Sequence, residues 1–285
     1  MSLRDALRSA AGRMREAGIV GNPEGEALTL AAHALGLPEE QVHRALVLRE
    51  EVALPPAFDA LLDERLRRVP LQHLTGRAHF RRLTLEVGPG VFVPRPETEV
   101  VVDLVLSAVD EARPSPVVVD LCTGSGAIAF AVKEERPEAE VHAVELSPDA
   151  YAWADRNQSR LDLDVDLRLG DATEAFPDLE GEVDVVAANP PYIPVGMVPV
   201  DPEVRDHDPG LALYGGSADG LRIPLAVAAR AAELLRPGGV LVVEHADEQG
   251  ESLPLALHRT GSWVEVVDRC DLTGRPRATV ARRAP

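Results

Sequence analysis

The chain has 285 residues, enough for a small domain beside a larger one, and its hydrophobic fraction of 45% allows a sizeable core. Its formal net charge is −18, and most of the excess negative charge lies after residue 95. An acidic bulk repels phosphate backbones, so we expect no direct nucleic-acid binding. The N-terminus lacks the apolar core of a secretory signal, and no apolar run approaches the ~20 residues that span a bilayer. We therefore expect a cytoplasmic protein without membrane contact.

The first 70 or so residues predict a bundle of short helices. Apolar residues recur at helical spacing, and Asn22 stands before Pro23 as an N-cap before a proline at the first helical position. We expect four helices, which begin near Leu3, Pro23, Pro38 and Pro56, the last of them ending near Val69. The arginines between residues 65 and 82 form either a basic patch for a partner or an ordinary solvated face.

The pattern changes between Ala78 and Val93, where apolar residues and Gly88-Pro89-Gly90 indicate a β-hairpin or a short extended linker. Beyond Pro116, short apolar strands alternate with helices. The predicted strands are 117–119, 141–144, 165–169, 183–187, 240–243, 264–267 and 278–280. The predicted helices are about 97–112, a helix that begins near 126, and 148–160, 218–235 and 248–258. Residues 236–239 close the helix 218–235. This alternation predicts a mostly parallel sheet covered by helices on both faces.

The two cysteines, Cys122 and Cys270, are far apart in the sequence, which indicates neither a disulfide framework nor a zinc site. We expect two buried, reduced thiols, because free cysteine is among the most buried residue types. No metal site is predicted.

The first motif with chemistry is the run from Asp120 to Gly126, Asp-Leu-Cys-Thr-Gly-Ser-Gly, which follows a strand and opens a helix. Its glycines allow a sharp turn and a close approach to a ligand, and the helix N-terminus presents free N–H groups. Glu145, at the end of the next strand, can accept hydrogen bonds from a ribose diol. Taken alone, this pattern fits a structural turn, a nicotinamide or flavin site, or an S-adenosylmethionine site.

The second motif, Asn189-Pro190-Pro191-Tyr192, decides between these sites. It follows the 183–187 strand, and ligands of open α/β sheets bind beyond the carboxyl ends of the strands, so it shares an edge with the glycine motif. The alternative, a proline-rich turn with a buried tyrosine, does not explain this register. The pair of motifs favours methyl transfer from S-adenosyl-L-methionine.

The residue types suit an amide substrate, whose nitrogen is a poor nucleophile because its lone pair is delocalised. Asn189 offers a side-chain carbonyl and Pro190 a backbone carbonyl whose direction the ring restricts, so the two can accept both N–H groups of a planar amide. Tyr192 can pack against the flat amide. Proximity and orientation then provide most of the catalysis, and neither a metal nor a separate general base is required before transfer.

Two further stretches allow two interpretations each. The run from Phe92 to Glu99 is either a rigid hinge with a helix cap or a cover over the methionine end of the cofactor. In Glu244-His245, a histidine at a strand end suggests a base, although a structural role is the favoured interpretation.

Together these residues resemble the release factor glutamine methyltransferases. The motifs that carry the resemblance are 70–76, 92–99, 120–126, 189–192, 212–221 and 243–245. Asn-Pro-Pro-Tyr also occurs in DNA adenine methyltransferases, whereas Pro-Arg-Pro-Glu-Thr-Glu and Ala-Leu-Tyr-Gly-Gly are more specific.

The resemblance implies an α/β class I methyltransferase fold: a Rossmann-like, seven-stranded, mostly parallel sheet, with a small N-terminal helical bundle and a β-hairpin linker. It implies a substrate-recognition domain over residues 1–75, a linker over 76–95 and a methyltransferase domain over 96–285. The implied substrate is the glutamine of the Gly-Gly-Gln motif in class 1 peptide chain release factors. The implied cofactor residues are Phe92, Cys122, Thr123, Gly124, Ser125, Gly126, Glu145, Asp171, Ala172 and Asn189. The implied substrate residues are Asn189, Pro190, Pro191 and Tyr192, of which Asn189, Pro190 and Tyr192 are catalytic.

The chain departs from the family at three places: Cys122 replaces a glycine, Ala172 a larger residue, and 207–209 a Glu-Pro pair. Two other substrates remain open, a glutamine of a ribosomal protein and an adenine of a nucleic acid. The charge, with Lys133 as the single lysine, argues against the adenine.

Overall fold

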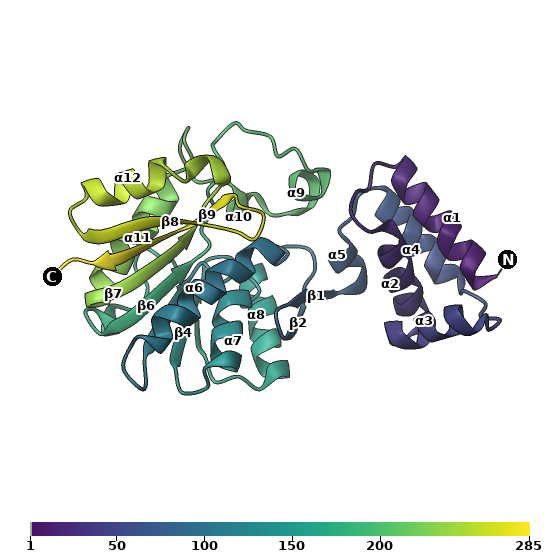
Figure 1. Cartoon of the computed structure of the whole chain (residues 1–285), viewed down its shortest axis with the longest axis horizontal. Coiled ribbons are helices and arrows are strands. Elements are labelled where there is room, and N and C mark those ends of the chain that lie inside the picture. The colour runs from purple at the N-terminus through teal and green to yellow at the C-terminus, as the bar shows by residue number, and fades with distance from the viewer. Residues whose placement is uncertain (1) are drawn as a thin grey trace. The chain divides into compact units, whose positions relative to one another are not determined.

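The computed structural model describes residues 2–285 and divides into two compact units. We call Met1–Arg77 with Pro199–His207 the helical unit, and Ala78–Val198 with Asp208–Pro285 the sheet unit. Figure 1 labels the elements of both. Within residues 2–285, no helix has the length and apolar character needed to cross a membrane.

The helical unit is a bundle whose first four helices begin where the sequence predicts. They are α1 (Leu3–Glu16), α2 (Pro23–Leu35), α3 (Glu39–Leu48) and α4 (Pro56–Leu66), followed by the short α5 (Leu71–Thr75) and, from the second segment, α9 (Pro202–His207). The Asn22 side chain accepts the Gly25 N–H at the start of α2, and Gly36 ends the helix in the left-handed conformation. Met14, Leu30 and neighbouring apolar residues fill the core.

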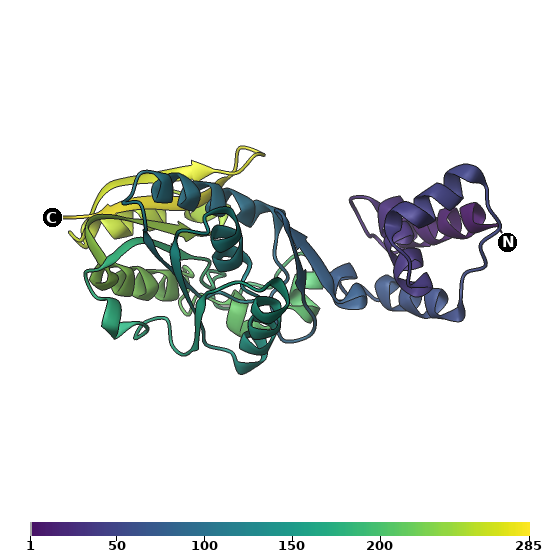
Figure 2. The same cartoon turned by 90° about the horizontal axis from the view of Figure 1, so that it is seen from below.

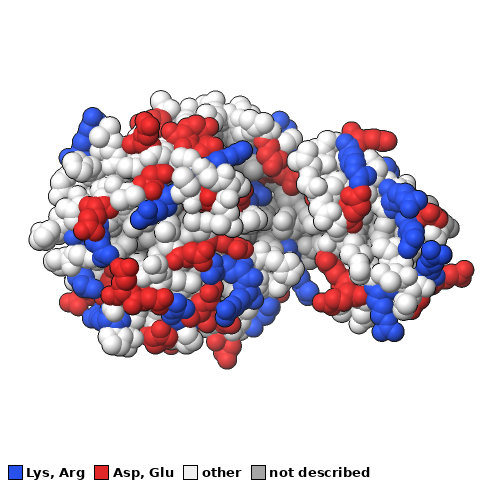
Figure 3. All heavy atoms as spheres, in the orientation of Figure 1, with Lys and Arg blue, Asp and Glu red and all other residues white. Residues whose placement is uncertain are grey.

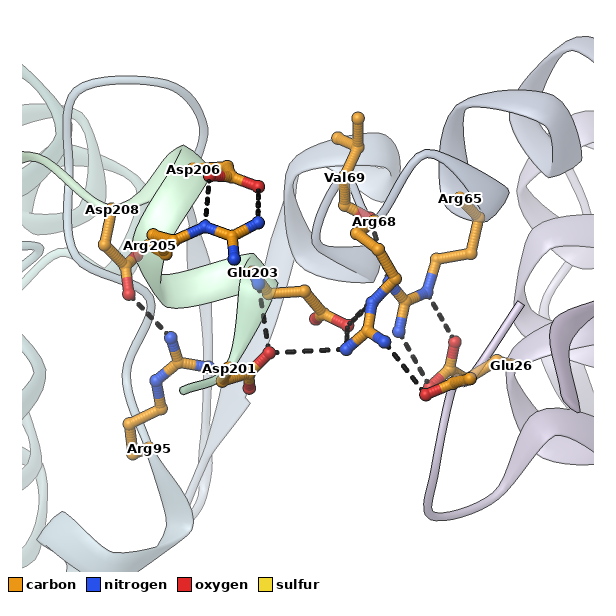
Figure 4. A network of polar contacts seen from close by, with 11 residues as sticks. Glu26, Arg65, Arg68, Val69, Arg95, Asp201, Glu203, Arg205, Asp206 and Asp208 are labelled. Atoms are coloured by element: carbon orange, nitrogen blue, oxygen red, sulfur yellow. Dashed lines mark hydrogen bonds and ion pairs between the residues drawn. The ribbon is translucent and has the colours of Figure 1, made fainter. Parts of the chain in front are cut away.

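Ion pairs hold the 199–207 segment against the rest of the helical unit (Figure 4). Glu203 Oε1 accepts from Arg65 Nη1 at 2.8 Å and pairs with Arg68 Nη2 at 3.0 Å. The Arg65 side chain is only 3% exposed, and its Nε also donates to Glu26 at 2.6 Å. A buried guanidinium with two carboxylate partners is satisfied, whereas one that lost a partner would be costly. Nothing in the sequence around Glu203 indicates this role.

The arginine stretch between residues 65 and 82 is not a continuous basic patch. In the helical unit, Arg65 and Arg68 are occupied by the acidic partners just described. In the sheet unit, Arg81 donates to Glu135 at 2.6 Å and to Asp103 at 2.7 Å. These contacts neutralise half of the arginines in the stretch and favour a structural interpretation for them.

The sheet unit contains a seven-stranded sheet in the order β5-β4-β3-β6-β7-β9-β8. Its strands are β3 (Val117–Leu121), β4 (Glu140–Glu145), β5 (Asp166–Leu169), β6 (Val183–Ala188), β7 (Leu235–Glu244), β8 (Trp263–Cys270) and β9 (Pro276–Arg283). β3 to β7 pair in parallel, and β9 runs antiparallel to both β7 and β8. This is the mostly parallel sheet that the sequence predicts.

Helices cover both faces of this sheet (Figures 1 and 2). They are α6 (Glu99–Asp110), α7 (Ala127–Glu135) and α8 (Pro148–Leu161) on one face, and α11 (Arg222–Leu234) and α12 (Ser252–Arg259) on the other. Val118 packs with the first group, whereas Val117 and Val119 pack with the second. Because side chains alternate along a strand, the run of valines supplies both cores.

The predicted hairpin consists of β1 (Arg77–Phe80) and β2 (Leu83–Glu86). Phe80 and Leu85 are buried in the same core as α6 to α8. Apart from Arg77, the hairpin therefore belongs to the hydrophobic core of the sheet unit.

Several expectations about single elements were wrong. The helix expected from Ala218 begins at Arg222, because Gly220 has a left-handed backbone and Asp219 closes a turn onto the Leu221 N–H. The Arg-Pro-Gly-Gly run after it is part of β7. The short helices α9 and α10 (Gly210–Leu213) lie in a segment for which no helix or strand was predicted. Both cysteines are free, but neither is fully buried as predicted: Cys122 is half-buried and Cys270 is exposed on β8.

Candidate active site

The carboxyl ends of four neighbouring strands lie at one edge of the sheet, and the predicted motifs follow them. Leu121 of β3 is opposite both Val144 of β4 and Ala188 of β6. Glu145 of β4 is opposite Leu169 of β5. The sheet order places successive strands on opposite sides of β3, so this edge is the topological switch point where α/β proteins bind ligands.

The loop after β3, residues 122–126, is called the glycine loop here. Its backbone is left-handed at Cys122, Gly124 and Gly126, with φ of 71°, 59° and 90°. A Cβ on Gly126 would collide with the Phe130 ring, so this position requires glycine. Cys122 adopts the same backbone region despite its side chain, at a cost of roughly 1–2 kcal/mol. The departure from glycine at Cys122 is therefore accommodated with strain.

Asp120, the last acidic residue before the loop, ties it to α7. Its Oδ2 accepts the Thr123 hydroxyl at 2.6 Å and the Ala129 N–H at 3.2 Å. Burial raises the pKa of Asp120 to about 7, although both hydrogen bonds favour the charged form. Asp120 fixes the loop from behind and is itself buried.

Glu145 connects β4 to the glycine loop. Its Oε2 accepts the Gly124 N–H and its Oε1 the Ser147 N–H, each at 2.8 Å. Burial raises the pKa of Glu145, and the backbone N–H groups oppose that shift. Each carboxylate oxygen has a further acceptor site, so a ribose diol can still be bound.

These residues fit S-adenosylmethionine. A Cβ built on Gly124 would meet no atom within 4 Å, so the outer face of the loop is open. Leu146, beside the Glu145 carboxylate, is 49% exposed and offers apolar surface to a base. After β5, Asp171 Oδ1 accepts the Thr173 N–H at 2.8 Å in a tight turn, and Ala172 is buried behind it. A turn, a carboxylate and an apolar face are the groups that a nucleoside requires.

The loop after β6, Asn189–Tyr192, is called the proline loop here. Its prolines, Pro190–Pro191, are buried. Asn189 Nδ2 donates to the Thr98 hydroxyl at 3.5 Å, and the Tyr192 hydroxyl donates to Glu244 Oε1 at 3.3 Å. Burial raises the pKa of Tyr192, so the phenol stays protonated and remains a donor.

The 212–221 run and Gln249 support the backbone at the end of the proline loop and just after it. Gly215 N–H donates to the Ile193 carbonyl at 2.9 Å, and Gln249 Nε2 donates to the Tyr192 carbonyl at 3.0 Å. A Cβ on Gly220 would collide with the Tyr192 carbonyl, and one on Gly215 with the Gly220 carbonyl. Both positions require glycine because two backbone segments meet there. This explains, on structural grounds, why the 212–221 run contains these two glycines.

The run from Phe92 to Glu99 makes contacts of two kinds. The Arg95 guanidinium carbon lies 5.2 Å from the Phe92 ring centroid, and Arg95 also donates to the buried Asp208 at 2.7 Å. Thr98 contacts Asn189 as described. The structure brings Thr98 to the proline loop and pairs Phe92 with Arg95, and a role for Phe92 over the cofactor stays a prediction.

Sequence reasoning did not include Thr98 among the site residues, and it left Glu244 without a role. The signal for Thr98 was its place inside Pro-Arg-Pro-Glu-Thr-Glu. The signal for Glu244 was its place at the end of the strand that neighbours β6.

His245 has the structural role that the sequence analysis favoured. It is fully buried, its Nδ1 lies 2.8 Å from the Ala246 carbonyl, and its Nε2 lies 3.1 Å from Asp268. Burial lowers the pKa of His245. Its ring nitrogens face these groups, so it does not serve as a base for the proline loop.

The fold and the two loops define the class of protein. A methyltransferase from Pyrococcus furiosus shares the fold with a TM-score of 0.51 at 18% identity, covering 70% of this chain and 89% of that one. Residues 82–197 match the family described as Methyltransferase small domain. The chain is a methyltransferase with the class I fold.

The relatives are more specific. Residues 5–76 match the PrmC N-terminal domain. The release factor glutamine methyltransferase of Streptomyces coelicolor is 49% identical over 98% of this chain and 97% of its own length. That of Bifidobacterium longum is 46% identical over 97% and 98%. The chain belongs to the release factor glutamine methyltransferase family.

Proposed function

We propose that this chain transfers a methyl group from S-adenosylmethionine to the side-chain amide nitrogen of the glutamine in the Gly-Gly-Gln motif of class 1 release factors. The observation that carries the proposal is the full-length similarity to enzymes of that name, with the proline loop and glycine loop at neighbouring strand ends. S-adenosylmethionine, when bound, supplies an electrophilic methyl group on its sulfonium.

The glycine loop, Glu145, Asp171 and Ala172 would hold the cofactor, and Phe92 would cover its methionine end. The Asn189 side-chain carbonyl and the Pro190 backbone carbonyl would accept the two N–H groups of the substrate amide. Held in this way, the amide is planar and oriented, and electron density on its nitrogen increases. Tyr192 and Pro191 would pack against its faces. Orientation of this kind lowers the barrier without a general base.

We also propose a division of labour along the chain. Residues 1–75 would recognise the body of the release factor, residues 76–95 would connect the two parts, and residues 96–285 would catalyse the transfer. The helical bundle carries none of the cofactor motifs, which supports this division.

We propose that the partner is a protein and that the reaction takes place in the cytoplasm. We propose neither a nucleic acid nor a membrane as a partner. On the visible face of the sheet unit, basic side chains are interspersed with acidic ones (Figure 3). The net charge of −18 adds long-range repulsion toward a phosphate backbone.

The test is a methylation assay with labelled methyl donor and three acceptors: a purified release factor, ribosomal protein and DNA. We expect label on the release factor alone, mapped by mass spectrometry to the glutamine of Gly-Gly-Gln. A release factor with that glutamine replaced by alanine is the matched control and should take up no label. Label on ribosomal protein or DNA, with none on the release factor, would refute the proposal.

A further inference from the structure

Glu244 is a buried carboxylate at the end of β7, and its side chain faces the proline loop. It is 2% exposed. β7 pairs in parallel with β6, with Val243 opposite Ala188, so the next residues along the two strands are Glu244 and Asn189. A buried carboxylate is costly unless neighbouring groups stabilise it, so its partners indicate what it does.

Two hydroxyl groups stabilise this carboxylate. The Tyr192 hydroxyl donates to Oε1 at 3.3 Å, and the buried Thr98 hydroxyl lowers the pKa of the carboxyl, as a hydrogen-bond donor does. Among residues 2–285, Oε2 has no hydrogen-bond partner, so the Thr98 hydroxyl is near the carboxyl without being aligned in a full hydrogen bond with that oxygen. Hydrogen bonds of this kind become shorter and better aligned when substrate binds.

The direction of these hydrogen bonds decides which way Asn189 faces. A carboxylate can only accept, so the single hydroxyl hydrogen of Thr98 is directed to Glu244. Thr98 Oγ1 must then accept from its other neighbour, and Asn189 Nδ2 donates to it at 3.5 Å. With the amino end of Asn189 held there, its carbonyl end is left for a substrate N–H. A rotated amide would present a donor to the substrate and lose the interaction.

We propose that Glu244 is a positioning residue for the reaction: through Thr98 it sets the orientation of the Asn189 amide, and through the Tyr192 hydroxyl it holds the aromatic ring of the same loop. This inference rests on the proposed function, because it concerns the residues that would bind the substrate amide. Glu244 does not itself touch the substrate in this scheme.

The ionisation of Glu244 controls the direction of the chain of hydrogen bonds. Burial raises its pKa to about 7, while Thr98, Arg277 and Tyr192 oppose the shift and Glu97 adds to it. A protonated carboxyl can donate to Thr98 and reverse the chain. The transfer step should therefore slow as the pH falls through about 7, because the Asn189 carbonyl is then no longer directed to the substrate.

The experiment measures single-turnover methylation of intact release factor by the full chain, at saturating methyl donor, between about pH 6 and 9. The variants are Glu244→Gln, Thr98→Val, the double variant, and Thr98→Ser as the matched control that keeps the hydroxyl. Calorimetry with the demethylated cofactor product and thermal melts confirm that each variant is folded and binds cofactor.

We expect Glu244→Gln and Thr98→Val each to lower the rate about 10- to 100-fold at pH 8, the size of effect that misplacement of a positioned group produces. The low-pH decline should disappear in Glu244→Gln. Thr98→Ser should stay within about threefold of the wild type, and the double variant should be no slower than the worse single one, because both act through one chain.

Two results would overturn the inference. One is a Glu244→Gln variant that keeps the wild-type rate and pH profile. The other is a double variant whose loss is the product of the single losses. The outcome is separate from that of the proposed function: if the wild type does not methylate release factor, the function is wrong, whereas an unaffected Glu244→Gln variant refutes only the positioning role.

Discussion

The glycine loop and the proline loop follow neighbouring strands, but different kinds of interaction hold them in place. The glycine loop is fixed mainly by its own backbone. It has left-handed residues at Cys122, Gly124 and Gly126, and its Gly124 N–H donates to the carboxylate of Glu145. The contacts that shape it come from β3, β4 and the helices α7 and α8, at most 32 residues away along the chain.

The proline loop depends on side chains that are distant in the sequence. Thr98 is 91 residues before Asn189, and Glu244 is 52 residues after Tyr192. The comparison shows that the cofactor half of the site is a local backbone structure, whereas the amide half is assembled by tertiary contacts. Changes in the two halves should therefore affect different measurable quantities.

The largest effect should come from Asn189, in the amide half. Asn189→Ala should lower the single-turnover rate ~10²–10³-fold, the loss found when one positioned transition-state contact is removed, and lower cofactor affinity far less. Asn189→Asp should be impaired less than alanine, because a carboxylate still accepts a hydrogen bond but also places a charge beside the sulfonium. If the single-turnover rates of the wild type, Asn189→Ala and Asn189→Asp lie within about threefold of one another, Asn189 is only a turn residue.

Removing part of the helical unit should affect neither half of the site directly. A shortened chain without Met1–Val69 should lose ~10²-fold in efficiency on intact release factor, because the factor is no longer positioned. Its cofactor affinity and its turnover of a short Gly-Gly-Gln peptide should be retained. Glu203→Gln in the shortened chain is the control for the charge that the deletion leaves unpaired. Full activity of a folded, shortened chain on release factor would contradict the proposed recognition role.

Glu145 probes the cofactor half. Glu145→Ala should weaken cofactor binding by about 1–3 kcal/mol, the range for a lost hydrogen bond to a charged group, and should leave the rate at saturating cofactor close to that of the wild type. Glu145→Gln keeps one acceptor oxygen, so its cofactor affinity should lie between those of the wild type and Glu145→Ala. Calorimetry gives the affinities, and a slower rate with unchanged affinity would show that the two halves are not separable.

The smallest effects should separate the two glycines of the glycine loop. Gly126→Ala should destabilise the fold by about 1–3 kcal/mol, because the new methyl group collides with the Phe130 ring in a left-handed backbone. The methyl group that Gly124→Ala adds meets no atom within 4 Å, so this variant should lose only ~1 kcal/mol of stability to backbone strain. Thermal melts without ligand measure both. Equal losses would mean that the Phe130 contact is not what requires glycine.

The same contrast explains what could be predicted from the sequence. Proline and asparagine caps gave the helix starts, and runs of valine gave the strands, because these signals are local. The Ala218 start was wrong because the turn before α11 depends on Gly220 lying against the Tyr192 carbonyl. Thr98 and Glu203 were missed because their partners are many residues away. Whether the site residues bind as proposed stays a prediction.

The 199–207 segment has a consequence for how the protein is made. The chain passes from one unit to the other three times, after residues 77, 198 and 207. Arg65 finds its partner Glu203 across 138 residues of sequence. During synthesis, the first 77 residues leave the ribosome long before Glu203 is available, so the buried guanidinium lacks one of its carboxylates for most of translation. The helical unit begins first but is completed late, and its final stability is set by a segment of the catalytic half of the chain.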